Sequence, residues 1–196
     1  MASLQTLTKG FLGWIFSCCC CLPLLLASPL PPKGTGLASS AHHACRLREV
    51  NFQQSYIRNR TYTLARMVQV LDQDTDNRLI GQQLYVNVTE NNRCYMMKRI
   101  VKIVVKDVLL TEAKDQYPYA EEVAQFLASL TSELSGCKLS GNREHIEKNL
   151  EEMKTKMNQL GENGKTKAIG ELNLLFDYLE NACTDAPKKR VNQKQN

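Results

Sequence analysis

The segment 143–160 has the clearest pattern of apolar and polar positions in the chain. Its apolar residues are spaced four, three, four and three positions apart; they are Ile146, Leu150, Met153, Met157 and Leu160. This spacing places them on one face of an α-helix, with the intervening lysines and glutamates turned away. Asn142 suits the N-cap and Gly161 suits the end of the helix. The pattern therefore predicts an amphipathic helix about 27 Å long.

Three further segments repeat the helical spacing. The last carries Ala168, Ile169, Leu172, Leu175, Phe176 and Leu179 and ends at Cys183. Another is marked by Val123, Phe126, Leu127, Leu130 and Leu134. A first helical region, which we predict to be broken near Asn59, carries Phe52, Tyr56, Tyr62, Leu64 and Val68. Gly170 costs about 1 kcal/mol relative to alanine inside a helix, so surrounding packing must stabilise the last segment.

The segment 100–110 is rich in β-branched residues, which favour strands. One helical face nevertheless collects Met97, Ile100, Val101, Val104 and Val108. No second segment of comparable strength could pair with it, and an isolated strand cannot satisfy its backbone hydrogen bonds. We therefore predict a helix here and an all-α fold for the body of the chain.

The polar stretch 71–78 interrupts the periodicity and predicts a connecting loop. Asp72, Asp74 and Asp76 alternate as in a calcium-binding loop, but Asn77 stands where glycine is needed and Gln83 where the closing glutamate should be. We therefore expect a loop without a metal ion. Exposed loops on a rigid scaffold commonly carry binding residues.

The first 38 residues predict a secretory leader. An apolar run at 11–27 follows the single charge of Lys9 and gives way to proline, glycine and serine. Small residues permit cleavage after Ala27 or after Ala38. A membrane anchor is the alternative, because the run approaches the roughly 20 residues that span a bilayer, but it lacks a flanking basic cluster. We therefore divide the chain into a signal and processing region at 1–38, a helical domain at 39–183 and a basic flexible tail at 184–196.

The cysteines indicate a disulfide-linked extracellular domain. Four lie in the leader at 18–21, and Cys45, Cys94, Cys137 and Cys183 remain after its removal. An oxidising compartment favours two disulfides, and spacing alone leaves three pairings open. Without a Cys-x-x-Cys pair no zinc site is expected. The neighbouring His42 and His43 could bind a stray metal ion, although an exposed arm is the simpler interpretation.

Two Asn-x-Thr sequons fit a secreted protein. They begin at Asn59 and Asn87, and neither has proline in the middle position. Both asparagines are therefore predicted to be glycosylated. Because a glycan needs an accessible acceptor, both are also predicted to lie on the surface.

Charge and short motifs argue against several function classes. Residues 45–183 contain 19 lysines and arginines against 19 aspartates and glutamates, so the positive excess lies in the terminal segments. A balanced body does not predict nucleic-acid binding. The basic tail motif at 187–191 is expected to be solvated, with weak anchoring to sulfated glycans as the alternative. The body carries no catalytic motif, and its one histidine, His145, falls on the polar margin of a predicted helix.

Several separate segments resemble the interleukin-10 family of helical cytokines. They are residues 51–62, the loop 75–81, residues 93–98, residues 167–172 and the triplet Asn181-Ala182-Cys183. Together they span nearly all of 45–183 in order. The resemblance implies a compact six-helix bundle with disulfides Cys45–Cys137 and Cys94–Cys183. It also implies action outside the cell and no enzymatic activity. We further expect a monomer with no cofactor and no stable membrane insertion.

The resemblance further implies two receptor-binding surfaces. A specific class II receptor chain is expected to contact Arg66, Asp72, Thr75, Asp76, Arg78, Gly81, Lys167 and Glu171. The shared interleukin-10 receptor beta chain is expected to contact Tyr56, Asn59, Arg60, Tyr119 and Glu122. Bridging the two chains would start Janus kinase and STAT signalling, and a soluble binding protein is a further expected partner.

Other interpretations of the same residues remain open. Asp76 could merely organise its loop, and Lys167 could pair with Glu171 along a helix. On the binding interpretation, Lys167→Glu should weaken contact with the specific receptor chain while preserving the fold. The alternative functions are a secreted helical carrier of a lipid or small molecule and, less favoured, a disulfide-linked secreted enzyme.

Overall fold

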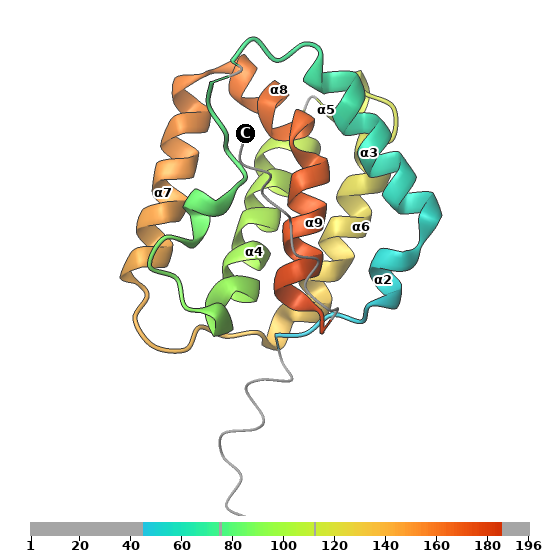
Figure 1. Ribbon diagram of the computed structural model, residues 1–196. Helices are drawn as coiled ribbons and strands as arrows, with labels where there is room; N and C mark the ends of the chain where they lie inside the picture. The colour runs from blue at the N-terminus through green and yellow to red at the C-terminus, as the bar shows by residue number, and fades with distance from the viewer. Residues whose placement is uncertain (1–44, 75, 112, 186–196) are drawn as a thin grey trace, which may run out of the picture. The chain divides into compact units, whose positions relative to one another are not determined.

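The computed structural model describes residues 45–74, 76–111 and 113–185, which belong to a unit of the chain spanning 36–196. The leader and nearly all of the tail lie outside these residues. Every regular element in the described ranges is a helix, and six helices have nine or more residues (Figure 1). They are α3 (Ser55–Gln69), α4 (Glu90–Val104), α6 (Ala120–Glu133), α7 (Glu144–Gln159), α8 (Glu162–Gly170) and α9 (Leu172–Cys183). The predicted all-α, six-helix bundle is confirmed.

Shorter helical elements precede or lie between these helices. They are α2 (Val50–Gln53), α5 (Ala113–Gln116), the 3-10 turns η1 (Gln82–Tyr85) and η3 (Leu134–Gly136), and the π-helical turn η2 (Val105–Leu109) that continues α4. None of the helices in the described ranges combines the length and the apolar character needed to cross a bilayer.

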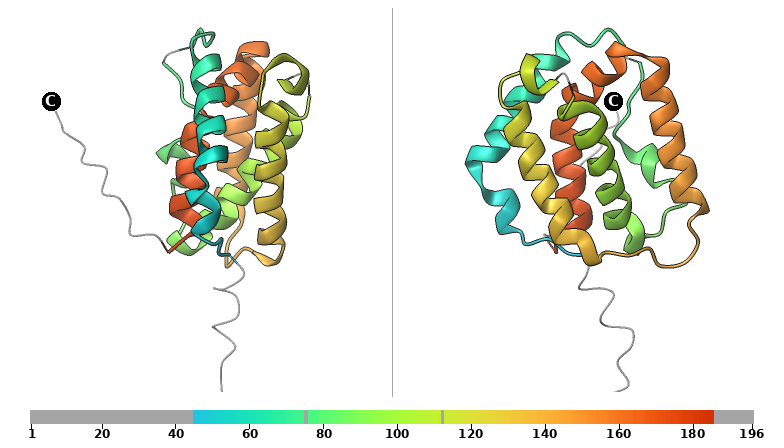
Figure 2. Two further views of the ribbon diagram at one scale, coloured as in Figure 1. Left: turned by 90° about the vertical axis from the view of Figure 1, so that its right-hand side faces the viewer. Right: turned by 180° about the vertical axis from the view of Figure 1, so that it is seen from behind.

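The bundle is built around α9 and α4. Helix α9 packs against α3 and α4, α4 packs against α6, and α8 lies against both α3 and α7. Figures 1 and 2 show α9 and α4 between α3 and α6 on one side and α7 on the other. Phe176 of α9 is fully buried, with its ring centroid 5.2 Å from that of Phe52 and 6.1 Å from that of Phe126. Aromatic side chains from α9, α2 and α6 therefore pack together in the core.

Two predicted helices occur where the periodicity placed them. Helix α7 ends just before Gly161, whose φ of 56° favours glycine, and the Glu144 amide donates to Asn142 Oδ1 over 2.8 Å. The segment 100–110 continues α4 as a helix, with Ile100, Val101 and Val108 fully buried. Packing on both neighbouring helices thus outweighs the strand preference of its β-branched residues.

Two predicted boundaries are wrong. The first helical region breaks at Gln54, where ψ is 96°, and Asn59 lies inside the continuous helix α3. The bend lets Phe52 turn inward to Phe176, and the Phe52 carbonyl accepts a hydrogen bond from Arg58 Nε over 3.2 Å. The last predicted segment is divided at Glu171 into α8 and α9. There the glutamate side chain bonds backbone amides of another loop, as described below.

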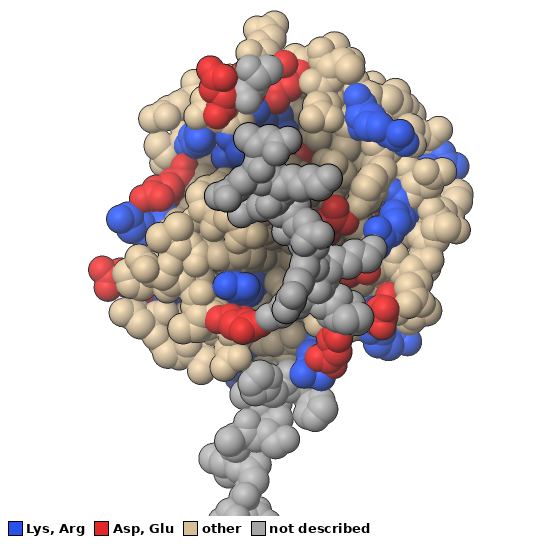
Figure 3. Space-filling view, viewed as in Figure 1, with Lys and Arg blue, Asp and Glu red and all other residues tan. Residues whose placement is uncertain are grey.

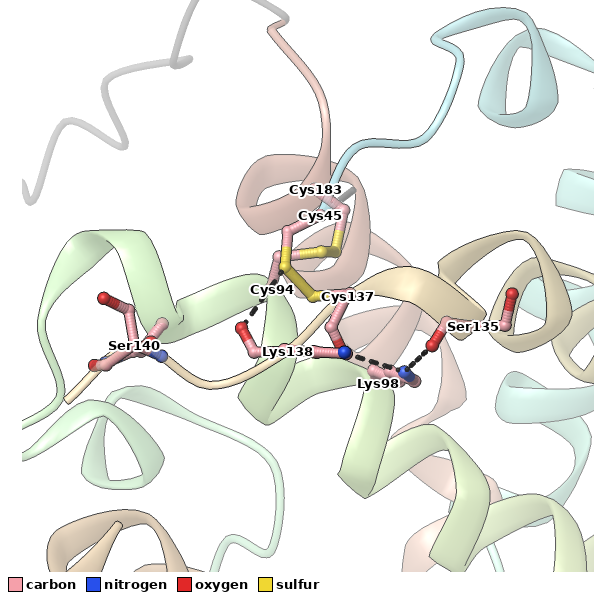
Figure 4. The surroundings of a disulfide bond; sticks show 9 residues. Cys45, Cys94, Lys98, Ser135, Cys137, Lys138, Ser140 and Cys183 are labelled. Atoms are coloured by element: carbon pink, nitrogen blue, oxygen red, sulfur yellow. Dashed lines mark hydrogen bonds between the residues drawn. A yellow bond between two sulfur atoms is a disulfide. The ribbon is translucent and has the colours of Figure 1, made fainter. Parts of the chain in front are cut away.

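Two disulfides lie together at one end of the bundle (Figure 4). Cys45 is bonded to Cys137 and Cys94 to Cys183, with Cα–Cα distances of 4.4 and 4.8 Å. This is the pairing that the family resemblance implied. Lys98 is buried beside them and donates from Nζ to the carbonyls of Ser135 (3.3 Å) and Cys137 (3.0 Å). Burial, followed by the nearby charge of Lys102, lowers the pKa of Lys98.

Candidate functional site

The loop between α3 and η1 borders α8 and the start of α9. A polar hollow of about 550 Å³ opens beside it, with Asp76, Arg78 and Asn173 among its lining residues. Over the molecular face seen in Figure 3, acidic and basic side chains are interspersed rather than separated by sign. This agrees with the balanced charge of residues 45–183.

Lys167 lies beneath this loop rather than on its outer surface. Its side chain is only 3% exposed, and Nζ donates to Asp72 Oδ2 over 2.7 Å and also to the Asp74 carbonyl. The distance from Nζ to Glu171 Oε1 is 4.0 Å, the helical pairing that the spacing permitted. The acidic loop therefore folds around a lysine ammonium group.

Glu171 fastens the other end of the same loop. Its Oε2 accepts hydrogen bonds from the backbone amides of Ile80 (2.6 Å) and Leu79 (3.0 Å). Burial raises the pKa of Glu171, and the hydrogen bond from Ile80 and the charge of Lys167 oppose that effect in part. This use of the side chain accounts for the division between α8 and α9.

The other residues expected at the specific receptor surface fall into two groups. Arg66, Asp76 and Arg78 are exposed, whereas Asp72 is 13% exposed and Gly81 is buried. A Cβ atom on Gly81 would lie 2.5 Å from Gln83 Oε1. Any other residue at this position would therefore displace the Gln83 side chain. Thr75 lies outside the described residues. The structure thus brings Asp72, Asp76, Arg78, Gly81, Lys167 and Glu171 to the loop and its support but exposes only some of them, while Arg66 lies on α3 and bonds the carbonyl of Tyr62.

Four of the residues expected at the shared receptor surface, Tyr56, Arg60, Tyr119 and Glu122, form a cluster between α3 and the start of α6. Arg60 Cζ lies 3.9 Å from the ring centroid of Tyr119 and 4.8 Å from that of Tyr56. Tyr56 donates its hydroxyl to Glu122 Oε1 over 2.5 Å, and Arg60 Nη2 donates to the Tyr56 hydroxyl over 3.1 Å. Asn59 lies beside Arg60 on α3 and is exposed. These contacts hold a guanidinium between two aromatic rings, a favourable cation–π arrangement.

Tyr119 of this cluster has an unusual backbone conformation. Its φ is 70°, in the left-handed region that residues other than glycine seldom occupy, and it immediately precedes α6. The Tyr119 ring lies on the Arg60 guanidinium in this conformation, and strained backbone conformations are often found at binding sites.

Asn87 is exposed, as its sequon predicted. It has a φ of 57°, which asparagine tolerates better than most residues. Within the described residues no group of three histidine, cysteine or carboxylate side chains is placed to hold a metal ion. His42 and His43 lie outside those residues.

Asn163 also holds the loop between α3 and η1 in place, but it was not predicted from the sequence. Its side chain contacts both Asp72 and the backbone of Gln73. The available signal was its position, because Asn163, Lys167 and Glu171 are four residues apart and share one face of a helix.

The disulfide-linked helical bundle and its two surface clusters define a helical cytokine of the interleukin-10 type. A family model described as "Interleukin 22 IL-10-related T-cell-derived-inducible factor" matches residues 45–183. Interleukin-22 of Homo sapiens is 42% identical over 183 residues, which cover 93% of this chain and 99% of that protein. Interleukin-22b of Mus musculus is 45% identical over 139 residues, covering 71% of this chain and 78% of that protein. The chain belongs to the interleukin-22 family and is a cytokine rather than an enzyme.

Proposed function

We propose that the chain is a secreted cytokine that bridges the interleukin-22 receptor alpha chain and the shared interleukin-10 receptor beta chain. Bringing these chains together would juxtapose their cytoplasmic kinases and start Janus kinase and STAT signalling in epithelial and barrier cells. A soluble interleukin-22 binding protein would compete for the surface used by the alpha chain. The cytokine supplies geometry and carries out no chemistry itself.

The supporting observation is that residues distant in sequence converge into two separate clusters. Asp72 meets Lys167 from 95 positions away, and Tyr56 meets Glu122 from 66 positions away. Each disulfide links one end of the segment 45–183 to a cysteine inside it, Cys45 to Cys137 and Cys183 to Cys94, so the bundle can present both clusters in a fixed relation. This is what a bridging ligand requires.

The first surface would recognise the alpha chain through its exposed charges. Asp76 and Arg78 stand on the outer side of the loop, where they can make charge-assisted hydrogen bonds that fix orientation. Lys167 and Glu171 would contribute by holding the loop, because their side chains are almost fully buried.

The second surface would recognise the beta chain through Tyr56, Arg60 and Tyr119. Tyrosine and arginine dominate many interfaces because they combine contact area with directional polar groups. A glycan on the exposed Asn59 would border this surface and adjust its affinity.

Signalling in cells that carry each receptor chain alone, or both, tests the proposal. We expect STAT phosphorylation only when both chains are present. A response without one of them would overturn the assignment of that chain. A lipid or small molecule that copurified in stoichiometric amount would instead favour a carrier.

A further inference from the structure

A column of side chains on α8 and at the α8–α9 junction supports the loop between α3 and η1. Its members, Asn163, Lys167 and Glu171, are one helical turn apart and contact successive parts of the loop. Asn163 meets residues 72 and 73, Lys167 meets residues 72 and 74, and Glu171 meets residues 79 and 80. The loop is therefore anchored at both ends from beneath.

Asn163 makes two contacts with the first part of the loop. Its Oδ1 accepts the Gln73 backbone amide over 3.2 Å, and its Nδ2 donates to Asp72 Oδ1 over 3.4 Å. Asp72 Oδ1 also accepts the Asp74 amide over 3.0 Å, while Oδ2 binds Lys167. One carboxylate thus joins Asn163, Lys167 and the loop backbone.

We propose that Asn163 is a positioning residue for the surface that binds the specific receptor chain. It orients the Asp72 carboxylate and the Gln73 backbone, and through them it fixes the part of the loop that presents Asp76 and Arg78. Ordering a loop before binding removes an entropic cost that the complex would otherwise bear. The inference rests on the proposed function and adds to it a residue that acts through the loop.

The test compares Asn163→Ala with the matched control Asn158→Ala, which removes the same side chain from an exposed position near the end of α7. Hydrogen exchange is measured at the amides of Gln73 and Asp74, and kinetics are measured on immobilised ectodomains of both receptor chains. Loss of these hydrogen bonds should raise loop exchange and weaken alpha-chain binding by about three- to tenfold, while beta-chain binding stays unchanged. The control should match the wild type throughout.

A second variant separates geometry from general loss of contacts. Asn163→Asp keeps the acceptor for the Gln73 amide but removes the donor and places a like charge beside Asp72. It should weaken alpha-chain binding at least as much as Asn163→Ala does.

Each other outcome has a defined meaning. Unchanged loop exchange in Asn163→Ala, or faster exchange with unchanged alpha-chain binding, would overturn the positioning role. Equal weakening toward both receptor chains would also overturn it, because that result indicates general damage to the bundle. Failure of the wild type to bind the alpha chain would overturn the proposed function, whereas the exchange data would still decide whether Asn163 orders the loop.

Discussion

Replacing Lys167 with methionine tests whether its ammonium group stabilises the loop from within. Nζ lies 2.7 Å from Asp72 Oδ2 and also donates to the Asp74 carbonyl, and the lysine side chain is 3% exposed. Removing one partner of a buried ion pair costs about 3–5 kcal/mol. Asp72 is 13% exposed and keeps hydrogen bonds from Asn163 and the Asp74 amide, so we expect the low end, about 3 kcal/mol.

The assay is urea unfolding followed by far-ultraviolet circular dichroism. A double-mutant cycle with Lys167→Met and Asp72→Asn separates the pair from other effects of each substitution. We expect a coupling energy of about 1–2 kcal/mol, so that the double variant loses less stability than the two single losses combined. Additivity within about 0.5 kcal/mol would refute the reasoning.

The same geometry revises the expected effect of Lys167→Glu. That substitution would place a carboxylate against Asp72 in a nearly buried position, so it should reduce stability as well as receptor binding. A loss of binding in that variant alone could not identify Lys167 as a receptor contact.

Three further predictions concern acid, packing and glycans. Burial raises the pKa of Glu171 above its ordinary value of 4.5, so the folded state holds this proton more tightly than the unfolded chain. The wild type should therefore gain stability relative to Glu171→Gln as pH falls from neutrality toward 4.5, and a constant difference in urea unfolding would contradict this. Gly164→Ala would put Cβ 2.0 Å from the Met157 carbonyl oxygen. We expect the free energy of unfolding to fall by about 2 kcal/mol and the melting temperature to fall by roughly 4–8 °C. An unchanged melting curve would contradict this clash. Mass spectrometry of protein secreted from mammalian cells should find N-glycans at the exposed Asn59 and Asn87, with Asn87→Gln removing one, and unmodified peptides at both sites would count against the prediction.

The periodicity of apolar residues was sufficient to predict where the helices lie, because the spacing that forms one apolar face is visible in the local sequence. Apolar and charged positions of 143–160 recur so regularly at helical spacing that α7 was predictable, although its N-cap is Arg143, one residue after the predicted Asn142. The break at Gln54 was not, because it depends on Phe52 reaching Phe176 more than a hundred positions away. The division at Glu171 likewise depends on the amides of Leu79 and Ile80.

Family resemblance supplied the residues of the candidate surfaces, but it did not indicate which of them are buried and which are exposed. Family resemblance indicated both Arg78 and Lys167, yet burial assigns one to the outside of the loop and the other to its support. Asn163 was missed because its importance comes from Asp72 and Gln73, which only the folded chain brings to it. Sequence pattern identifies faces, whereas tertiary packing decides which charged groups remain available to a partner.

The most direct test of the two-surface account measures binding of Arg78→Ala and Arg60→Ala to the alpha-chain and beta-chain ectodomains separately. Arg78 lies on the exposed loop, and Arg60 lies between Tyr56 and Tyr119 at the other cluster. We expect Arg78→Ala to weaken only alpha-chain binding and Arg60→Ala to weaken only beta-chain binding. Loss of both interactions in either properly folded variant, or loss of neither, would contradict two separate receptor surfaces on one bundle.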